Sequence, residues 1–208
     1  MIDVTNYAQA AQALVDAGRF LYGRGWSPAT SSNYSARIDA EHIAITVSGR
    51  HKGQLKAGDV MVVDLDGRPV QSATRASAET ALHTVLYGLF TDIGAVIHTH
   101  SLAATVLSRA LQDRTEIVLQ DYELQKAFPG HETHESQVRL PIFENSQDIA
   151  SLAEETRQFF AENMEYPGYL IRGHGLYTWG ASVEDCLRHT EALEFLLACE
   201  LEMMRLAR

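Results

Sequence analysis

The stretch Gly94-Ala-Val-Ile-His-Thr-His100 decides the interpretation of this sequence, because a short apolar run ends there in two histidines. Such a run predicts a buried strand, and Ser101, a typical N-cap residue, predicts that a helix follows at once. Side chains alternate along a strand, so His98 and His100 are expected on the same face. Two imidazoles on one face can share a metal ion. His-x-His pairs also arise by chance in a chain with nine histidines.

The segments on either side of this stretch predict helices that alternate with strands. Apolar residues at helical spacing predict helices over residues 7–22, 77–90, 148–160 and from 182 to the C-terminus, and Ser77 is expected to cap the second of them. Short β-branched runs predict strands over residues 34–38, 42–47, 60–64, 94–100, 116–119, 138–140, 169–171 and 176–179. Since most of these strands are joined by hairpins, the pattern predicts a three-layer α/β/α sandwich around a mixed, largely antiparallel sheet.

Composition narrows the class of protein. The 208 residues, 46% of them apolar and without a linker or repeat, predict a single domain over residues 1–208. The formal net charge of −10 argues against nucleic acid or an anionic membrane as the main partner. No uncharged apolar run approaches the roughly 20 residues that span a bilayer. Cys186 and Cys199 lie in one helical pattern, about 20 Å apart, which is too far for a disulfide and favours the reducing cytoplasm.

A third histidine, His174, lies between Gly173 and Gly175 after a predicted strand. The missing side chains of its neighbours let the backbone and the imidazole approach a bound group closely. Three imidazoles leave an open position on Zn²⁺, which is typical of catalytic zinc. The alternative is three separate histidines at the surface or in hydrogen bonds.

Two carboxylates are candidates for proton transfer. Glu79 lies in the first turn of the helix predicted from Ser77, where the helix dipole also favours acidic residues. Glu123 lies three residues before Lys126, in a polar segment that is equally typical of a solvated surface. On these grounds alone both interpretations stay open.

Small polar residues and glycine in three loops are candidates for an anion site. The residues are Asn33, Ser48, Gly49, Lys52 and Ser77. Backbone N–H groups, hydroxyls and one ammonium can hold a phosphate without making the protein basic. Turns and helix caps use the same residue types, so each loop alone has a structural explanation as well.

Taken in order, these segments resemble the class II aldolase family from about the first helix to the last. The motifs that carry the resemblance are Thr-Ser-Ser-Asn-Tyr-Ser (30–35), Ser-Gly-Arg-His-Lys-Gly (48–53), Ser-Ala-Glu (77–79), His-Thr-His (98–100) and Arg-Gly-His-Gly (172–175). Residues 26–31, 125–128, 141–145 and 170–180 are similar to a dehydratase branch of that family. The chain departs from the aldolases at Ala78, where they have a second serine, and at Ser32, where they often have glycine.

The resemblance implies a set of roles. His98, His100 and His174 would hold one Zn²⁺ per subunit, and the five loop residues would line the phosphate site. Glu123 would be the principal acid/base, and the aldolase carboxylate maps onto Glu79. The expected substrate is a phosphorylated ketose that loses water, and the expected assembly is a homotetramer with active sites near subunit contacts.

Two other activities stay open beside the dehydratase. One is an aldolase or epimerase acting on another sugar phosphate, such as fuculose or ribulose phosphate. The other is a non-catalytic interaction domain like the adducin head, which resembles the family but lacks its zinc histidines.

Overall fold

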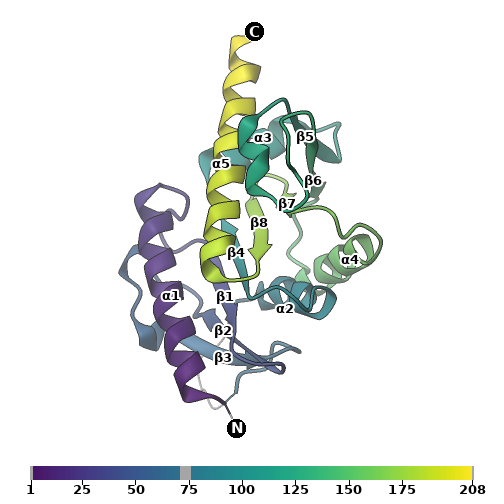
Figure 1. The fold of residues 1–208 in the computed structure, drawn as a ribbon. Coiled ribbons are helices and arrows are strands. Elements are labelled where there is room, and N and C mark those ends of the chain that lie inside the picture. The colour runs from purple at the N-terminus through teal and green to yellow at the C-terminus, as the bar shows by residue number, and fades with distance from the viewer. Residues whose placement is uncertain (1, 71–75, 208) are drawn as a thin grey trace.

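Eight strands form one mixed sheet in the computed structural model, which describes residues 2–70 and 76–207 (Figure 1). The strands are β1 (Asn33–Arg37), β2 (His42–Thr46), β3 (Val60–Asp64), β4 (Ala95–Thr99), β5 (Glu116–Gln120), β6 (Gln137–Phe143), β7 (Gly168–Ile171) and β8 (Gly175–Gly180). Their order in the sheet is β3-β2-β1-β4-β8-β7-β6-β5. Every neighbouring pair is antiparallel except β6 and β7, which run parallel.

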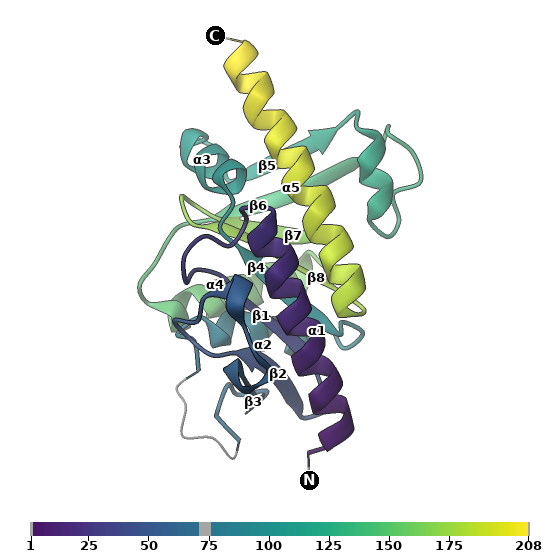
Figure 2. The same cartoon turned by 90° about the vertical axis from the view of Figure 1, so that its left-hand side faces the viewer.

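Helices cover both faces of this sheet. One face carries α1 (Val4–Gly23), α3 (Leu102–Ala110) and α5 (Val183–Leu206), and Figure 2 shows α1 and α5 crossing in front of the strands. The other face carries α2 (Thr80–Leu89) and α4 (Ile149–Glu162). Short 3₁₀ helices lie in the connections of the described part of the chain: η1 (Lys52–Gln54), η2 (Ala57–Asp59) and η3 (Glu123–Ala127). The predicted three-layer α/β/α sandwich is therefore confirmed.

Alternation along the strands builds a separate core on each face. On β4, Val96 packs in the cluster under α2 and α4, whereas Ala95 and Ile97 pack in the cluster under α1 and α5. The residues of these clusters are almost completely buried, so apolar burial is the main source of stability. Because His98 follows the same alternation as Val96, its imidazole lies on the α2 and α4 face.

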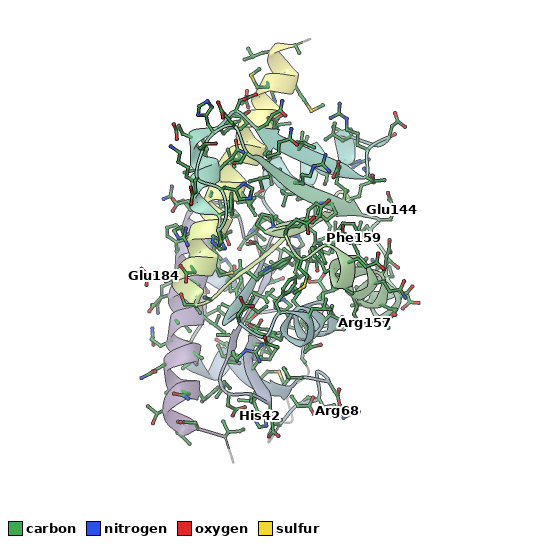
Figure 3. The ribbon with its side chains drawn as sticks, turned by 45° about the vertical axis from the view of Figure 1, so that its right-hand side comes forward. His42, Arg68, Glu144, Arg157, Phe159 and Glu184 are labelled. Atoms are coloured by element: carbon green, nitrogen blue, oxygen red, sulfur yellow. The ribbon has the colours of Figure 1, made fainter. Side chains whose placement is uncertain are left out.

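Charged side chains gather outside these cores. Figure 3 shows Arg68, Glu144 and Arg157 pointing away from the sheet. The ion pairs of Arg68 with Asp66 and of Arg157 with Glu154 are largely solvent-exposed. Exposed pairs of this kind contribute little to the free energy of unfolding.

The start of α2 differs from the prediction that Ser77 caps this helix. The helix begins at Thr80, and Glu79 is its N-cap residue without a side-chain capping bond. The hydroxyl of Ser77 instead accepts the N–H of Glu79 at 3.3 Å, and its carbonyl accepts the N–H of Thr80. Serine hydroxyls often form such local turns by accepting an N–H two residues ahead. This turn places Glu79 immediately before the first residue of α2.

The two cysteines are free, as predicted, and both lie on α5. None of the helices in residues 2–70 and 76–207 is long and apolar enough to cross a bilayer.

Candidate metal and substrate site

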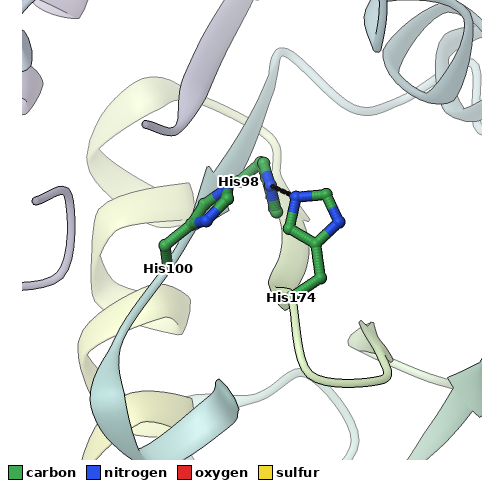
Figure 4. Close-up of side chains that lie close together, drawn as sticks. All are labelled: His98, His100 and His174. Atoms are coloured by element: carbon green, nitrogen blue, oxygen red, sulfur yellow. Dashed lines mark hydrogen bonds between the residues drawn. The ribbon is translucent and has the colours of Figure 1, made fainter. Parts of the chain in front are cut away.

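The structure brings the three predicted histidines together (Figure 4). His98 lies on β4, His100 follows the end of that strand, and His174 lies in the turn between β7 and β8. One ligand nitrogen from each ring lies within 4.8 Å of the other two. Segments 76 residues apart in the chain thus meet at one point.

The spacing of the imidazoles fits a shared ion. The Nε2 atoms of His98 and His174 lie 3.3 Å apart. Tetrahedral Zn²⁺ with Zn–N bonds of about 2.0–2.1 Å holds its nitrogens about 3.3 Å apart. The Nδ1–H of His98 donates to the carbonyl of Leu176 at 2.9 Å, which leaves the lone pair of Nε2 for a metal. The three residues therefore form a candidate metal site.

Burial favours the neutral form of the His98 and His100 rings. It lowers the pKa of His98 well below its ordinary value, and it lowers the pKa of His100 to about 4, with the charge of His174 acting in the same direction. Both rings are thus neutral near pH 7. Neutral imidazole is the form that binds metals.

A glycine makes the close approach of His174 to β4 possible. A Cβ atom at Gly175 would lie 1.9 Å from the carbonyl oxygen of Thr99. Only glycine leaves room for this contact between β8 and β4. Gly173, which precedes His174, has a φ of +65°, and this backbone conformation also favours glycine.

Glu79 lies beside the histidines. Its Oε1 is 3.2 Å from Nε2 of His174, and its Oε2 is 3.7 Å from Nε2 of His98. Burial alone would raise the pKa of Glu79, but the hydrogen bond with His174, the electrostatic effect of the neighbouring His98 and His174 rings and the hydrogen bond from Asn33 outweigh it and hold the pKa below its usual range. Glu79 is therefore a carboxylate near pH 7, placed to bind a metal or to hold its water.

A polar cavity of about 180 Å³ opens next to His100 and Glu79. Four of the five predicted phosphate residues line it: Asn33, Ser48, Gly49 and Ser77. Hydroxyls, an amide and glycine backbone in one small cavity suit an anion that is bound by hydrogen bonds.

Lys52, the fifth predicted phosphate residue, does not line this cavity. Its Nζ donates to the carbonyls of Arg50 at 2.8 Å and of Thr30 at 3.3 Å, and the residue is only 1% exposed. Burial lowers the pKa of Lys52 to about 8, against the opposing charge of Glu79. The ammonium is therefore protonated near pH 7 and fixes the loops that border the cavity.

The structure does not bring Glu123 to the histidines of its own chain. Glu123 begins η3, its side chain is 72% exposed, and its carboxylate pairs with Lys126 at 2.6 Å. The neighbouring Tyr122 donates its hydroxyl to Glu200 of α5. The segment that carries Glu123 therefore packs against α5, and its carboxylate pairs with Lys126 rather than with a histidine of the cluster.

One residue that the sequence analysis missed is Tyr177. It lies directly opposite His98 in the β4–β8 register, and the two rings stack with centroids 4.0 Å apart and 13° between their planes. This packing fixes the orientation of the imidazole. No local sequence pattern indicates the contact of Tyr177 with His98, because the two residues are far apart in the chain. The contact depends on the pairing of β4 with β8.

Comparison with known proteins identifies the family. Residues 12–201 match the model described as Class II Aldolase and Adducin N-terminal domain. The chain belongs to the class II aldolase family. Solved class II aldolases share its fold: an L-fuculose 1-phosphate aldolase aligns with a TM-score of 0.79 at 21% identity, covering 97% of this chain and 89% of that one. The enzyme of that name from Thermus thermophilus aligns with a TM-score of 0.73 at 26% identity, covering 96% and 97%.

Some curated proteins are far more similar to this chain in sequence than these structures are. A protein of Marinobacter nauticus is 67% identical over 208 residues, which is all of both chains. A protein of Hahella chejuensis is 62% identical over 206 residues, or 99% of each chain. Both carry the name methylthioribulose-1-phosphate dehydratase.

Proposed function

We propose that this protein is a hydro-lyase that converts 5-methylthioribulose 1-phosphate to 2,3-diketo-5-methylthiopentyl 1-phosphate, a step of methionine salvage. The observation that carries the proposal is the 67% identity, over the full length of both chains, to a dehydratase of that substrate. The site adds chemical support, because a cluster of three imidazoles and a carboxylate borders a small polar cavity.

The polar cavity would hold the phosphate of the ketose. The amide of Asn33 and the hydroxyls of Ser48 and Ser77 supply donors, and Gly49 leaves its backbone N–H accessible. Lys52 is buried and bonds to the backbone of the loops that border the cavity. Its positive charge would stabilise an anion in the cavity without contacting it. This arrangement directs the sugar carbons toward His100 and Glu79.

The histidines fit Zn²⁺, and we propose one ion per subunit on His98, His100 and His174. Bound there, Zn²⁺ acts as a Lewis acid for the negative charge that develops on the substrate when a proton leaves C3. Glu79 lies within reach of the same position, where it balances positive charge and orients a hydroxyl or water.

Dehydration requires one acid/base group above C3. The substrate loses the proton of C3 and the hydroxyl of C4 as water, and the resulting enol rearranges to the diketone. We assign proton removal at C3 and proton delivery to the leaving hydroxyl to Glu123. A base placed instead at the C4 hydroxyl would lead to cleavage of the C3–C4 bond, which is the aldolase reaction.

Glu123 would have to come from a neighbouring subunit. Within its own chain it pairs with Lys126 and not with the histidine cluster, and its side chain is exposed at the surface. We therefore propose a homo-oligomer, a tetramer as the family resemblance implies, in which η3 of one copy completes the site of the next.

Product analysis tests the function. The zinc-loaded protein is incubated with 5-methylthioribulose 1-phosphate, and the products are identified by NMR and mass spectrometry. We expect loss of one water to give the diketone phosphate. Formation of dihydroxyacetone phosphate would show aldol cleavage instead, and an unchanged substrate would contradict both activities.

A further inference from the structure

A line of buried polar side chains runs from α2 through β1 to Glu79. The hydroxyl of Tyr87 lies 3.0 Å from Oγ of Ser35, and that Oγ lies 2.7 Å from Nδ1 of His83. Nε2 of His83 bonds to Oδ1 of Asn33, whose Nδ2 donates to Oε2 of Glu79 at 2.5 Å. Tyr87, Ser35, His83 and Asn33 are each at most 5% exposed, so water does not compete for these bonds.

The chemistry of the groups fixes the direction of every bond. An ionised Glu79 only accepts hydrogen bonds, so the amide of Asn33 must turn its NH₂ to the carboxylate and its oxygen to His83. His83 then donates from Nε2, and its Nδ1 accepts the hydroxyl hydrogen of Ser35. The oxygen of Ser35 is left to accept from Tyr87. All donors therefore point toward Glu79.

The N–H of His83 decides which way the amide of Asn33 faces. If the amide rotated by half a turn, its oxygen would face the carboxylate of Glu79, and two acceptors would repel each other at hydrogen-bond distance. Burial lowers the pKa of His83 to about 4, so the ring is neutral and carries a single N–H. That one hydrogen is committed to Asn33.

We propose that His83 is a positioning residue for the reaction: through the amide of Asn33 it holds the carboxylate of Glu79 beside the histidine cluster. The inference rests on the proposed function, because it concerns the geometry of that site. The amide of Asn33 also lines the polar cavity, and it keeps a second hydrogen for a ligand there. The same amide thus connects the carboxylate with the proposed phosphate site.

Variants at position 83 separate positioning from folding. His83→Leu removes both ring nitrogens, whereas His83→Gln keeps an amide donor toward Asn33. Thr84→Ala is the matched control, because this buried residue follows on the same helix and, among residues 2–70 and 76–207, its hydroxyl bonds only to the carbonyl of Ala81. The measurements are kcat and KM with 5-methylthioribulose 1-phosphate, the pH profile of kcat, zinc content and Tm.

We expect His83→Leu to lower kcat about 10-fold or more with a smaller change in KM, and His83→Gln to stay within about threefold of wild type. The pH profile of kcat for His83→Leu should shift while its zinc content stays that of wild type. Thr84→Ala should keep the wild-type kcat. A folded His83→Leu with wild-type kcat and pH profile would overturn the proposal. If this variant does not fold, Asn33→Asp preserves the shape of the side chain, replaces the donor to Glu79 by an acceptor and is expected to lower kcat by a similar factor.

A measurement without substrate tests the positioning role of His83 separately from the proposed dehydratase function. In the metal-free protein, ¹⁵N chemical shifts of the His83 ring should show the Nε2–H tautomer. The Nδ1–H tautomer would reverse the direction of the bonds and contradict the positioning role, whether or not the enzyme turns over. Wild-type protein that shows the expected tautomer but no dehydration would contradict the proposed function alone.

Discussion

Nε2 of His98 and Nε2 of His174 lie 3.3 Å apart, although 76 residues separate them in the chain. Pairing of β4 with β8 creates this contact, since Thr99 lies opposite Leu176 and the turn before β8 carries His174. Gly175 permits the close approach of the two backbones. The candidate metal site is therefore a product of sheet topology rather than of a local motif.

Removal of one ligand should release the metal. His174→Ala leaves two imidazoles, so we expect zinc content to fall from one per subunit toward zero and dehydratase activity to be lost. His131→Ala, which changes a histidine outside the cluster, should retain both. Elemental analysis of dialysed protein measures the first effect, and full zinc occupancy in His174→Ala would show that the ion binds elsewhere.

Glu123→Gln should abolish turnover while zinc stays bound, because the amide cannot take the C3 proton. If η3 acts in the site of a neighbour, mixing Glu123→Gln with His174→Ala and reassembling the oligomer should restore part of the activity. Each hybrid then contains some sites with both groups intact. Parent variants that are inactive alone and stay inactive after verified exchange of subunits would argue against a shared site.

The fold and the cluster follow from sequence patterns to different extents. Alternation placed His98 and His100 on one face, and β-branched runs gave the strands, because both signals are local. The contact of Asn33 with Glu79 joins residues 46 apart and depends on α2 packing against β1, which no local pattern specifies. The position of Glu123 depends on how η3 packs against α5, and the neighbouring site that we propose for it depends on assembly.

Gly175→Ala should destabilise the protein strongly. The added Cβ would meet the carbonyl oxygen of Thr99 at 1.9 Å, so β4 and β8 must separate, which we expect to cost more than about 2 kcal/mol of the free energy of unfolding. Gly88→Ala is the matched control, since a Cβ there would meet no atom of the described residues within 4 Å beyond its chain neighbours and the backbone of its own helix. Urea denaturation compares the two, and equal midpoints would contradict the proposed close contact.

Glu194 should make stability depend on pH. This side chain of α5 is buried and accepts the hydroxyl hydrogen of Thr99 at 2.5 Å. Burial raises the pKa of Glu194 from 4.5 to about 7, against the hydrogen bonds of Ser101 and Thr99. The carboxyl is neutral in the folded protein at a pH where the unfolded chain has ionised it, so the free energy of unfolding should fall by about 3 kcal/mol between pH 4.5 and 7.

Glu194→Gln isolates that contribution, because the amide keeps an acceptor for Thr99 but does not titrate. We expect the variant to lack this fall and to be more stable than wild type above pH 7. Denaturant unfolding at several pH values gives the difference between the two proteins. A constant difference across that range would show that Glu194 has an ordinary pKa.

Anomalous diffraction at the zinc edge, from crystals of the zinc-loaded protein, tests most directly whether the three imidazoles converge on one ion. We predict a single strong peak per subunit, about 2.0–2.1 Å from a nitrogen of each of His98, His100 and His174. Rings that point to separate positions, or a peak away from all three, would contradict the account of the site and the chemistry built on it.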